Sequence, residues 1–359
     1  MTCIDRLNIS HVRNIDDISI CPGERVNLII GANGSGKTSI LESIHLLSVG
    51  RSFRSSKVAP VIQHGSSECT IYGELSEGAI TIGLQKFRTQ RHVLKVQGKK
   101  QPNWLEAARH LPLQVLDSNA FLLLEGSPKV RRRFLDWGVF HVEPGFMQHW
   151  TNSRTCIANR NLLLKSGRPD RHQLQAWSYE LSVEADLVDQ ARRGYFDAFS
   201  PVLLPLLQEF LPVSELSLSY FRGWDHQKAL SEVLQQSLEA DIRHGITQFG
   251  PHRADIKVRI GKAKAVELLS RGQQKLLVSA MKIAQGQLLA ERKRKRCIFL
   301  VDDLPAELDE ANRVRVCRIL ASLGGQVFVT CVESEPLNKC WDKATPLARF
   351  HVEHGKIGS

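Results

Sequence analysis

The sequence lacks the features that mark membrane, secreted and zinc-binding proteins. No run of about eighteen apolar residues occurs, and no basic segment followed by an apolar one opens the chain, so we expect neither a membrane-spanning helix nor a secretory signal. The eight cysteines are scattered singly, without a CxxC pair or a Cys/His cluster at zinc-ligand spacing. We therefore expect a cytoplasmic protein whose cysteines are small buried residues in a reducing compartment.

Acidic residues are too few to balance the basic ones. The 359 residues include 48 Lys and Arg against 37 Asp and Glu, a net charge of +11 that favours a polyanionic partner such as nucleic acid. Between Gly78 and Trp104 there is no acidic residue. A solvated strand face usually mixes both signs, so we predict that the basic residues here contact a DNA backbone, although they could only serve solubility. These residues are Lys86, Arg88, Arg91, Lys95, Lys99 and Lys100.

A glycine-rich loop follows a short apolar run. Residues 31–38 read GANGSGKT and fit the pattern GxxxxGK[ST]; the alternative is a Gly/Ser turn that matches by chance. Its glycines let successive backbone N–H groups converge on one anion site. The residues that follow have helical spacing, so this site also lies at a helix N-terminus. We predict that Lys37 reaches the β and γ phosphates of ATP as a catalytic residue and that Thr38 binds Mg²⁺. The predicted nucleotide-binding residues are Gly31, Ala32, Asn33, Gly34, Ser35, Gly36, Lys37, Thr38 and Ser39.

Two acidic residues end a second apolar run. Residues 297–301 are apolar, and Asp302 and Asp303 follow them. A buried strand that ends in paired carboxylates requires a cation nearby, so we expect Asp302 to associate with Mg²⁺, directly or through water. Asp303 should point across the strand pleat toward the γ-phosphate and is the candidate general base for the attacking water. The alternative is a pair of strand-end acids that face solvent.

The N-terminal part of the chain is rich in strand patterns. Residues 4–20 alternate apolar and polar in two short stretches and predict a β hairpin. Further strands are expected over 69–75, 79–85 and 92–96, which should form an antiparallel layer.

The middle of the chain carries helical patterns. Apolar residues at helical spacing over 146–164 and 174–199 flank a turn at Gly167–Asp170, which predicts an antiparallel helical hairpin. Prolines should end the second helix, at Pro201, Pro205 and Pro212, and residues 216–221 should return to a sheet. We therefore predict an α/β fold whose head comprises residues 1–125 and 215–359, with an α-helical lobe inserted over 126–214.

Several motifs together resemble those of one family. The turn LSRGQQKLL over 269–277, about thirty residues before Asp302, resembles the signature motif of ABC-type ATPases. The amino-acid sequence of this turn also resembles that of the RecF family of DNA replication and repair proteins. So do the phosphate loop GANGSGKTS, GRSFR at 50–54, EGSPKVRRRFLD at 125–136, GPHRADI at 250–256 and LVDDLPAELD at 300–309.

This resemblance implies an ABC-type head, with a P-loop mixed sheet, an antiparallel β layer and an inserted helical lobe, similar to Rad50 and SMC heads. It implies a DNA-binding clamp that works with RecO and RecR to help load RecA at gaps and supports the SOS response. In ABC-type heads the signature of one protomer closes over the γ-phosphate bound to the other. The resemblance therefore implies an ATP-driven homodimer in which each protomer supplies its signature residues in trans: Ser270, Arg271, Gly272 and Gln273.

The match to ABC-type ATPases is incomplete. Asp303 stands where transporter ATPases have the longer glutamate, so we expect weak, DNA-stimulated hydrolysis. Two other functions share these motifs: a transporter-type ATPase subunit, and an adaptor that binds ATP without significant hydrolysis. The basic residues between Gly78 and Trp104 and the RecF-like motifs favour the DNA-binding clamp over both.

Overall fold

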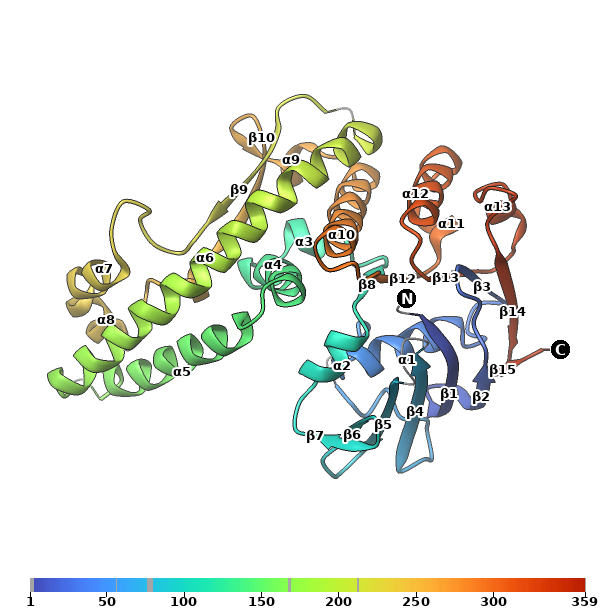
Figure 1. Cartoon of the computed structure of the whole chain (residues 1–359), viewed down its shortest axis with the longest axis horizontal. Coiled ribbons are helices and arrows are strands. Elements are labelled where there is room, and N and C mark those ends of the chain that lie inside the picture. The colour runs from blue at the N-terminus through green and yellow to red at the C-terminus, as the bar shows by residue number, and fades with distance from the viewer. Residues whose placement is uncertain (1–2, 56, 76–79, 167–168, 212, 359) are drawn as a thin grey trace. The chain divides into compact units, whose positions relative to one another are not determined.

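The computed structural model divides the chain into two compact units (Figure 1). It describes residues 3–358 except 56, 76–79, 167–168 and 212. The first unit combines residues 1–120 with 275–359, and the second comprises residues 121–274. Residues 215–274, which the sequence placed with the head, group with the second unit. The physical reason is local: Arg131 donates to both carboxylate oxygens of Asp255, with Nε–Oδ1 and Nη2–Oδ2 distances of 2.6 and 3.0 Å, which ties the segment to the helical region.

One sheet of the first unit is antiparallel, with strand order β2-β1-β4-β5-β6-β7. Its first two strands form the predicted hairpin, linked through Arg13 and Asn14, and the next strands confirm the predicted antiparallel layer. Position 79, the predicted start of one strand, lies outside the described residues. The strands are β1 (Ile4–Val12), β2 (Ile15–Ile20), β4 (Glu68–Leu75), β5 (Ile80–Phe87), β6 (Val93–Val96) and β7 (Lys99–Gln101).

The other sheet of this unit is mixed, with order β15-β14-β3-β13-β12-β8. All its neighbouring strands are parallel except β14 and β15. Because β13 lies between β3 and β12, the carboxyl ends of these three strands meet at one edge of the sheet. The strands are β3 (Val26–Ile30), β8 (Leu113–Leu116), β12 (Ile298–Val301), β13 (Val327–Cys331), β14 (Leu347–Glu353) and β15 (Lys356–Ile357).

One apolar core joins the two sheets of the first unit through α1. Ile40, Leu41, Ile44 and Leu47 of this helix are buried with side chains from both sheets. The core thereby fixes the helix that follows the glycine-rich loop. The helices of this unit are α1 (Lys37–Val49), α2 (Leu105–His110), α11 (Leu304–Glu307), α12 (Glu310–Ser322), α13 (Glu335–Asn338) and most of α10 (Arg271–Lys293).

The second unit is mainly helical. Helices α5 and α6 run side by side as the predicted hairpin (Figure 1), although Gly167 and Arg168 of the expected turn lie outside the described residues. Its helices are α3 (Leu122–Glu125), α4 (Pro128–Val142), α5 (Phe146–Leu164), α6 (Arg171–Phe210), α7 (Leu230–Gln236), α8 (Leu238–His244), the short 3₁₀ helix η1 (Pro251–Arg253) and α9 (Ala265–Leu268). A three-stranded sheet completes it, formed by β9 (Leu216–Phe221), β10 (Asp255–Ile260) and β11 (Ala263–Lys264).

The prediction that prolines end the second long helix is wrong for two of them. Pro201 and Pro205 both lie inside α6, which continues to Phe210. An interior proline costs a helix about 3 kcal/mol, but each large apolar side chain that is buried returns about 1.5–3 kcal/mol. The apolar face continues beyond Pro201 with four buried side chains, three of them also beyond Pro205, so packing outweighs the break; Pro212 lies outside the described residues. These side chains are Leu203, Leu206, Leu207 and Phe210.

In the described part of the chain, none of the helices has the length and apolar character needed to cross a bilayer.

Candidate nucleotide-binding site

The glycine-rich loop connects β3 to α1 and wraps around the side chain of Lys37. Gly34 and Gly36 have φ values of +80° and +120°, a region that favours glycine. At Gly31, a Cβ atom would lie 2.2 Å from the carbonyl oxygen of Val352, so the close approach of the backbone also requires glycine. The buried ammonium of Lys37 donates to the carbonyls of Gly31 and Ala32, at 2.7 and 2.9 Å. The predicted loop and helix are therefore present as a connected unit.

Three oxygen atoms meet where the carboxyl ends of β3, β13 and β12 come together. The hydroxyl of Thr38, at the start of α1, donates to Asp302 Oδ1 at 2.9 Å. The hydroxyl of Thr330, in the strand between them, donates to the same oxygen at 2.8 Å and is fully buried. The sheet thus brings together the two residues predicted to bind Mg²⁺, and it adds Thr330, which sequence reasoning missed.

Asp303 is positioned by a backbone turn and not by a strand pleat. It follows β12 with left-handed dihedral angles, φ +50° and ψ +47°, and its N–H donates to Thr330 Oγ1 at 2.7 Å. The pleat argument for its orientation was wrong, because the strand ends at Val301. Burial, and then the neighbouring charge of Asp302, raise the pKa of the Asp303 carboxyl, while Lys37 opposes this. A strained backbone and a raised pKa are both common at functional residues.

A cavity of about 590 Å³ opens beside the loop, and Lys37, Thr38, Asp302, Asp303 and Thr330 all line it. Sequence reasoning assigned no role to several of its other polar lining residues. The short segment between the two strands of the hairpin was the signal that could have indicated some of them. These additional residues include Arg13, Asn14 and His64.

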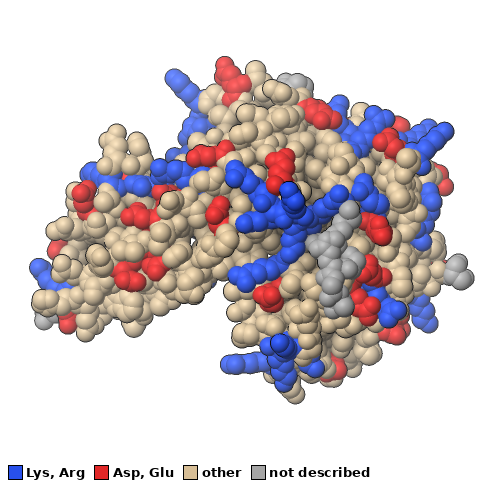
Figure 2. All heavy atoms as spheres, viewed as in Figure 1, with Lys and Arg blue, Asp and Glu red and all other residues tan. Residues whose placement is uncertain are grey.

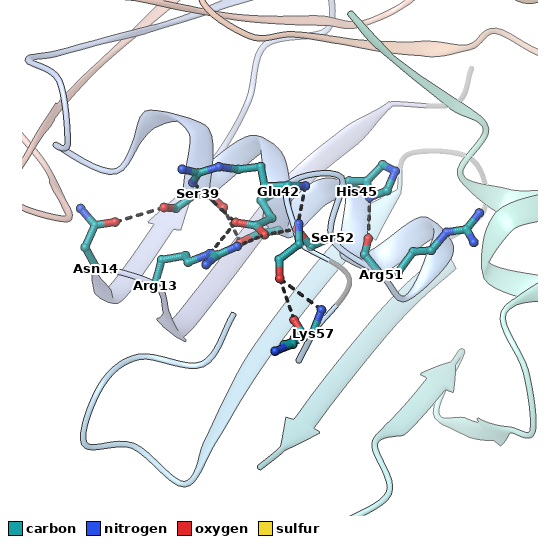
Figure 3. Close-up of polar contacts among 11 residues, drawn as sticks. Arg13, Asn14, Ser39, Glu42, His45, Arg51, Ser52 and Lys57 are labelled. Atoms are coloured by element: carbon teal, nitrogen blue, oxygen red, sulfur yellow. Dashed lines mark hydrogen bonds and ion pairs between the residues drawn. The ribbon is translucent and has the colours of Figure 1, made fainter. Parts of the chain in front are cut away.

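The hairpin tip is fastened directly to the phosphate loop. Asn14 Nδ2 donates to the Gly34 carbonyl at 2.8 Å, and its Oδ1 accepts from the Ser39 hydroxyl at 3.0 Å. Arg13 donates to the Glu42 carboxylate on α1 (Figure 3). Two adjacent residues of the hairpin therefore fix the loop and the first turns of the helix.

Two of the six predicted DNA contacts have other partners. Lys86 is only 3% exposed and lies with its ammonium 5.6 Å from the centroid of a Trp104 ring; burial lowers its pKa. We therefore remove it from the DNA-contact set, because a buried ammonium does not reach a DNA backbone. Arg88 donates to the carbonyls of Ser66 and Gln63, at 2.7 and 2.8 Å, and it lines the cavity. Its guanidinium holds a loop in place.

The remaining four predicted DNA contacts, Arg91, Lys95, Lys99 and Lys100, are exposed. Lys95 on β6 lies directly opposite Lys100 on β7. Figure 2 shows a cluster of basic side chains over these two strands, at the lower edge of the view. Like charges directly opposite each other repel and destabilise a sheet. An anion bound at this edge would reduce that repulsion, so the edge favours anion binding.

The signature turn lies in the second unit, at the start of α10. The Ser270 N–H donates to Gln273 Oε1 at 2.9 Å and the Gln273 N–H donates to Ser270 Oγ at 3.3 Å, which is a reciprocal helix cap. Arg271 forms an ion pair with Glu125. Apart from its chain neighbours and the backbone of its own helix, no atom of the described residues lies within 4 Å of the position that a Cβ at Gly272 would take, so the turn has an open side.

The fold and the loop define an ABC-type ATPase head of the kind found in SMC proteins. Residues 3–356 match the family model described as RecF/RecN/SMC N terminal domain. The DNA replication and repair protein RecF of Pseudomonas paraeruginosa (strain DSM 24068 / PA7) is 46% identical over 357 residues, which cover 99% of this chain and 97% of that protein.

Two solved structures share the fold. One, of the recombination mediator protein RecF with ATP in the RecFOR pathway, has a TM-score of 0.86 at 23% identity and covers 99% of this chain and 97% of that one. The other, an Smc head bound to the C-winged helix domain of ScpA, has a TM-score of 0.61 at 16% identity and covers 99% and 95%. The chain belongs to the RecF family, as its motifs predicted, and the transporter alternative gains no support.

Proposed function

We propose that this chain is an ATP-dependent DNA-binding clamp of recombinational repair and replication-gap processing, acting in the cytoplasm. Two protomers assemble on DNA with ATP between them, and slow hydrolysis releases them. The names of its relatives support a role in replication and repair, and one solved relative is a recombination mediator protein of the RecFOR pathway. We extend the proposal to cooperation with RecO and RecR in loading RecA and to support of the SOS response.

The observation that carries the proposal is the arrangement of Thr38, Asp302 and Thr330 at the end of the phosphate loop. The Thr38 and Asp302 oxygens are 2.9 Å apart, close to the separation of two neighbouring oxygen ligands at about 2.1 Å from an octahedral Mg²⁺. The Ser35 hydroxyl, within the loop, is buried without a hydrogen-bond partner among the described residues. An unsatisfied donor in a cradle of backbone amides fits a phosphate oxygen.

These residues have separate roles in the binding and hydrolysis of ATP. Mg²⁺, when bound, would neutralise charge on the β and γ phosphates. Thr38 and Asp302 would hold it, with Thr330 orienting Asp302 through its hydroxyl. Lys37 would exchange its two carbonyl partners for phosphate oxygens. Asp303 would take the proton of the attacking water, for which its raised pKa is suited.

The signature turn supplies the reason for a dimer. The Ser270 turn opens a helix N-terminus, which favours an anion, and one side of the turn is open. The ATP bound to the chain's own phosphate loop does not need this second anion site. We propose that Ser270, Arg271, Gly272 and Gln273 complete the ATP site of the partner protomer. Nucleotide binding then favours the dimer by mass action.

We propose that the exposed basic cluster formed by β6, β7 and Arg91, which precedes β6, contacts DNA phosphates. Contacts of this kind position a protein without reading base sequence, and their strength falls steeply with salt. The set consists of Arg91, Lys95, Lys99 and Lys100.

A titration of fluorescent DNA tests the proposal. Gapped, duplex and single-stranded DNA are titrated with the chain, with and without ATP and Mg²⁺, and the Lys37→Met variant is the matched control. We expect ATP to tighten DNA binding of the wild type about tenfold or more and to leave the variant unchanged, because the variant cannot hold the triphosphate. Equal DNA affinity with and without ATP in the wild type would refute the proposal.

A further inference from the structure

The carboxylate of Glu42, on α1, is the centre of a polar network beside the nucleotide pocket (Figure 3). Glu42 is fully buried. Arg13 donates to it twice, with Nε–Oε2 and Nη2–Oε1 distances of 2.8 and 2.6 Å, and the Ser52 hydroxyl also donates to it. Arg54 Nη1 lies 3.9 Å from Oε2. A buried carboxylate needs such partners, and this one takes them from two separate segments of the chain.

Glu42 does not line the cavity, but its two cationic partners do. Arg13 comes from the β1–β2 hairpin and is largely buried, with 19% of its side chain exposed. Arg54 comes from the loop after α1 and is 47% exposed. The single buried carboxylate therefore determines where two guanidinium groups stand at the rim of the pocket.

The same carboxylate anchors the described part of the loop after α1, residues 51–55 and 57. Ser52 Oγ accepts from the N–H groups of Arg54 and Ser55, both at 2.9 Å, while it donates to Glu42. The turn is thus built on a hydroxyl whose own hydrogen bond runs to Glu42. A second anchor joins the loop to α1, where His45 Nδ1 and the Arg51 carbonyl oxygen are 2.6 Å apart. Burial lowers the pKa of His45 to about 4, so the neutral ring donates its Nδ1–H.

We infer that Glu42 is a positioning residue of the nucleotide pocket: it holds Arg13 and the loop over 51–55 against α1 and so forms the rim of the pocket before nucleotide arrives. It acts through its partners and does not touch the nucleotide. The effect on ATP binding rests on the proposed function, whereas the anchoring of the loop does not depend on it.

Limited proteolysis of the nucleotide-free chain tests the anchoring. The loop contains three trypsin sites, after Arg51, Arg54 and Lys57, and its fragments are identified by mass spectrometry. The isosteric Glu42→Gln variant loses the charge that Arg13 and Ser52 bind. We expect cleavage at these three sites to become about tenfold faster, because a protease reports how often a segment opens.

Nucleotide affinity, measured with a fluorescent ATP analogue and Mg²⁺, separates positioning from simple electrostatics. Removing a negative charge near the pocket would by itself tighten binding of a polyanion. Loss of positioning has the opposite effect, and we expect Glu42→Gln to bind the analogue about tenfold more weakly. Unchanged or tighter binding would overturn the inference, as would unchanged cleavage of the loop.

Two further variants keep the test decisive. Glu74→Gln is the matched control, because this partly exposed glutamate of the same unit accepts a hydrogen bond from Tyr72 and pairs with Arg6, both on the antiparallel sheet; we expect wild-type cleavage and affinity. If Glu42→Gln does not fold, Glu42→Asp decides the matter, since it keeps the charge but draws the carboxylate back by one methylene from Arg13 and Ser52. Faster cleavage at the three sites supports the inference, and wild-type cleavage overturns it. If the wild type itself binds no ATP, the proposed function fails, and the cleavage experiment still decides the role of Glu42.

Discussion

The replacement Thr330→Val probes the point where three strand ends meet. Thr330 Oγ1 donates to Asp302 at 2.8 Å and accepts from the Asp303 N–H at 2.7 Å, and the side chain is fully buried. Valine has nearly the same shape, so no cavity forms and the change removes only the hydroxyl. Loss of a hydrogen bond to a charged group costs about 1.5–3 kcal/mol, and an unsatisfied buried N–H costs about 1–3 kcal/mol. Together these two losses come to about 2.5–6 kcal/mol, and because the site relaxes we expect the free energy of unfolding to fall by about 2.5–5 kcal/mol.

Urea unfolding followed by circular dichroism measures this difference, with Thr70→Val as the matched control. Thr70 lies on β4 of the same unit with its side chain exposed, so its replacement should change the free energy of unfolding by less than about 0.5 kcal/mol. We also expect Thr330→Val to weaken Mg²⁺-dependent ATP binding, because Asp302 loses its orienting donor. If Thr330→Val is as stable as Thr70→Val, the hydroxyl does not connect these strand ends and the reasoning is refuted.

Three further predictions concern hydrolysis and DNA binding. Asp303→Asn should abolish most ATP turnover and trap the dimer. In the wild type, turnover should fall as the pH drops through the raised pKa of Asp303, because the base must be ionised, so a phosphate-release assay should find the acid limb only in the wild type. Replacing both Lys95 and Lys100 by Glu should weaken DNA binding and reduce the slope of log K against log salt by about 1.4–1.8, from two lost phosphate contacts; an unchanged slope would exclude them. Lys86→Met should leave DNA affinity at the wild-type value in the same titration, because this ammonium is buried.

The parts of the site that the sequence predicts well are local. The phosphate loop, the helix after it and Asp302 beside Thr38 each depend on residues within a few positions of one another, and the structure has these three as expected. Asp303 differs, because a left-handed turn after β12 positions it and not the strand pleat. The hairpin and the antiparallel layer follow equally from their alternating patterns. A short-range pattern is sufficient where short-range physics determines the conformation.

The features that the sequence does not predict depend on strand order and packing. Thr330 meets Asp302 only because β13 lies between β3 and β12, which no local pattern specifies. Lys86 lies in a stretch whose basic composition predicts DNA contact, but Trp104 packs against its side chain and buries it. Pro201 lies within a helix because the apolar face beyond it is buried in the tertiary structure. In each case a distant segment overrides the local preference.

The most direct test of the account is a sedimentation velocity experiment that measures the mass of the species in solution as ATP and Mg²⁺ are added. We expect a monomer to become a dimer with the wild type, and we expect Lys37→Met to remain a monomer because it cannot hold ATP. Ser270→Arg should bind ATP and remain a monomer, because its phosphate loop is intact while the helix cap that closes over the partner's nucleotide is blocked. A wild-type chain that is saturated with ATP and stays monomeric on DNA would contradict the central claim.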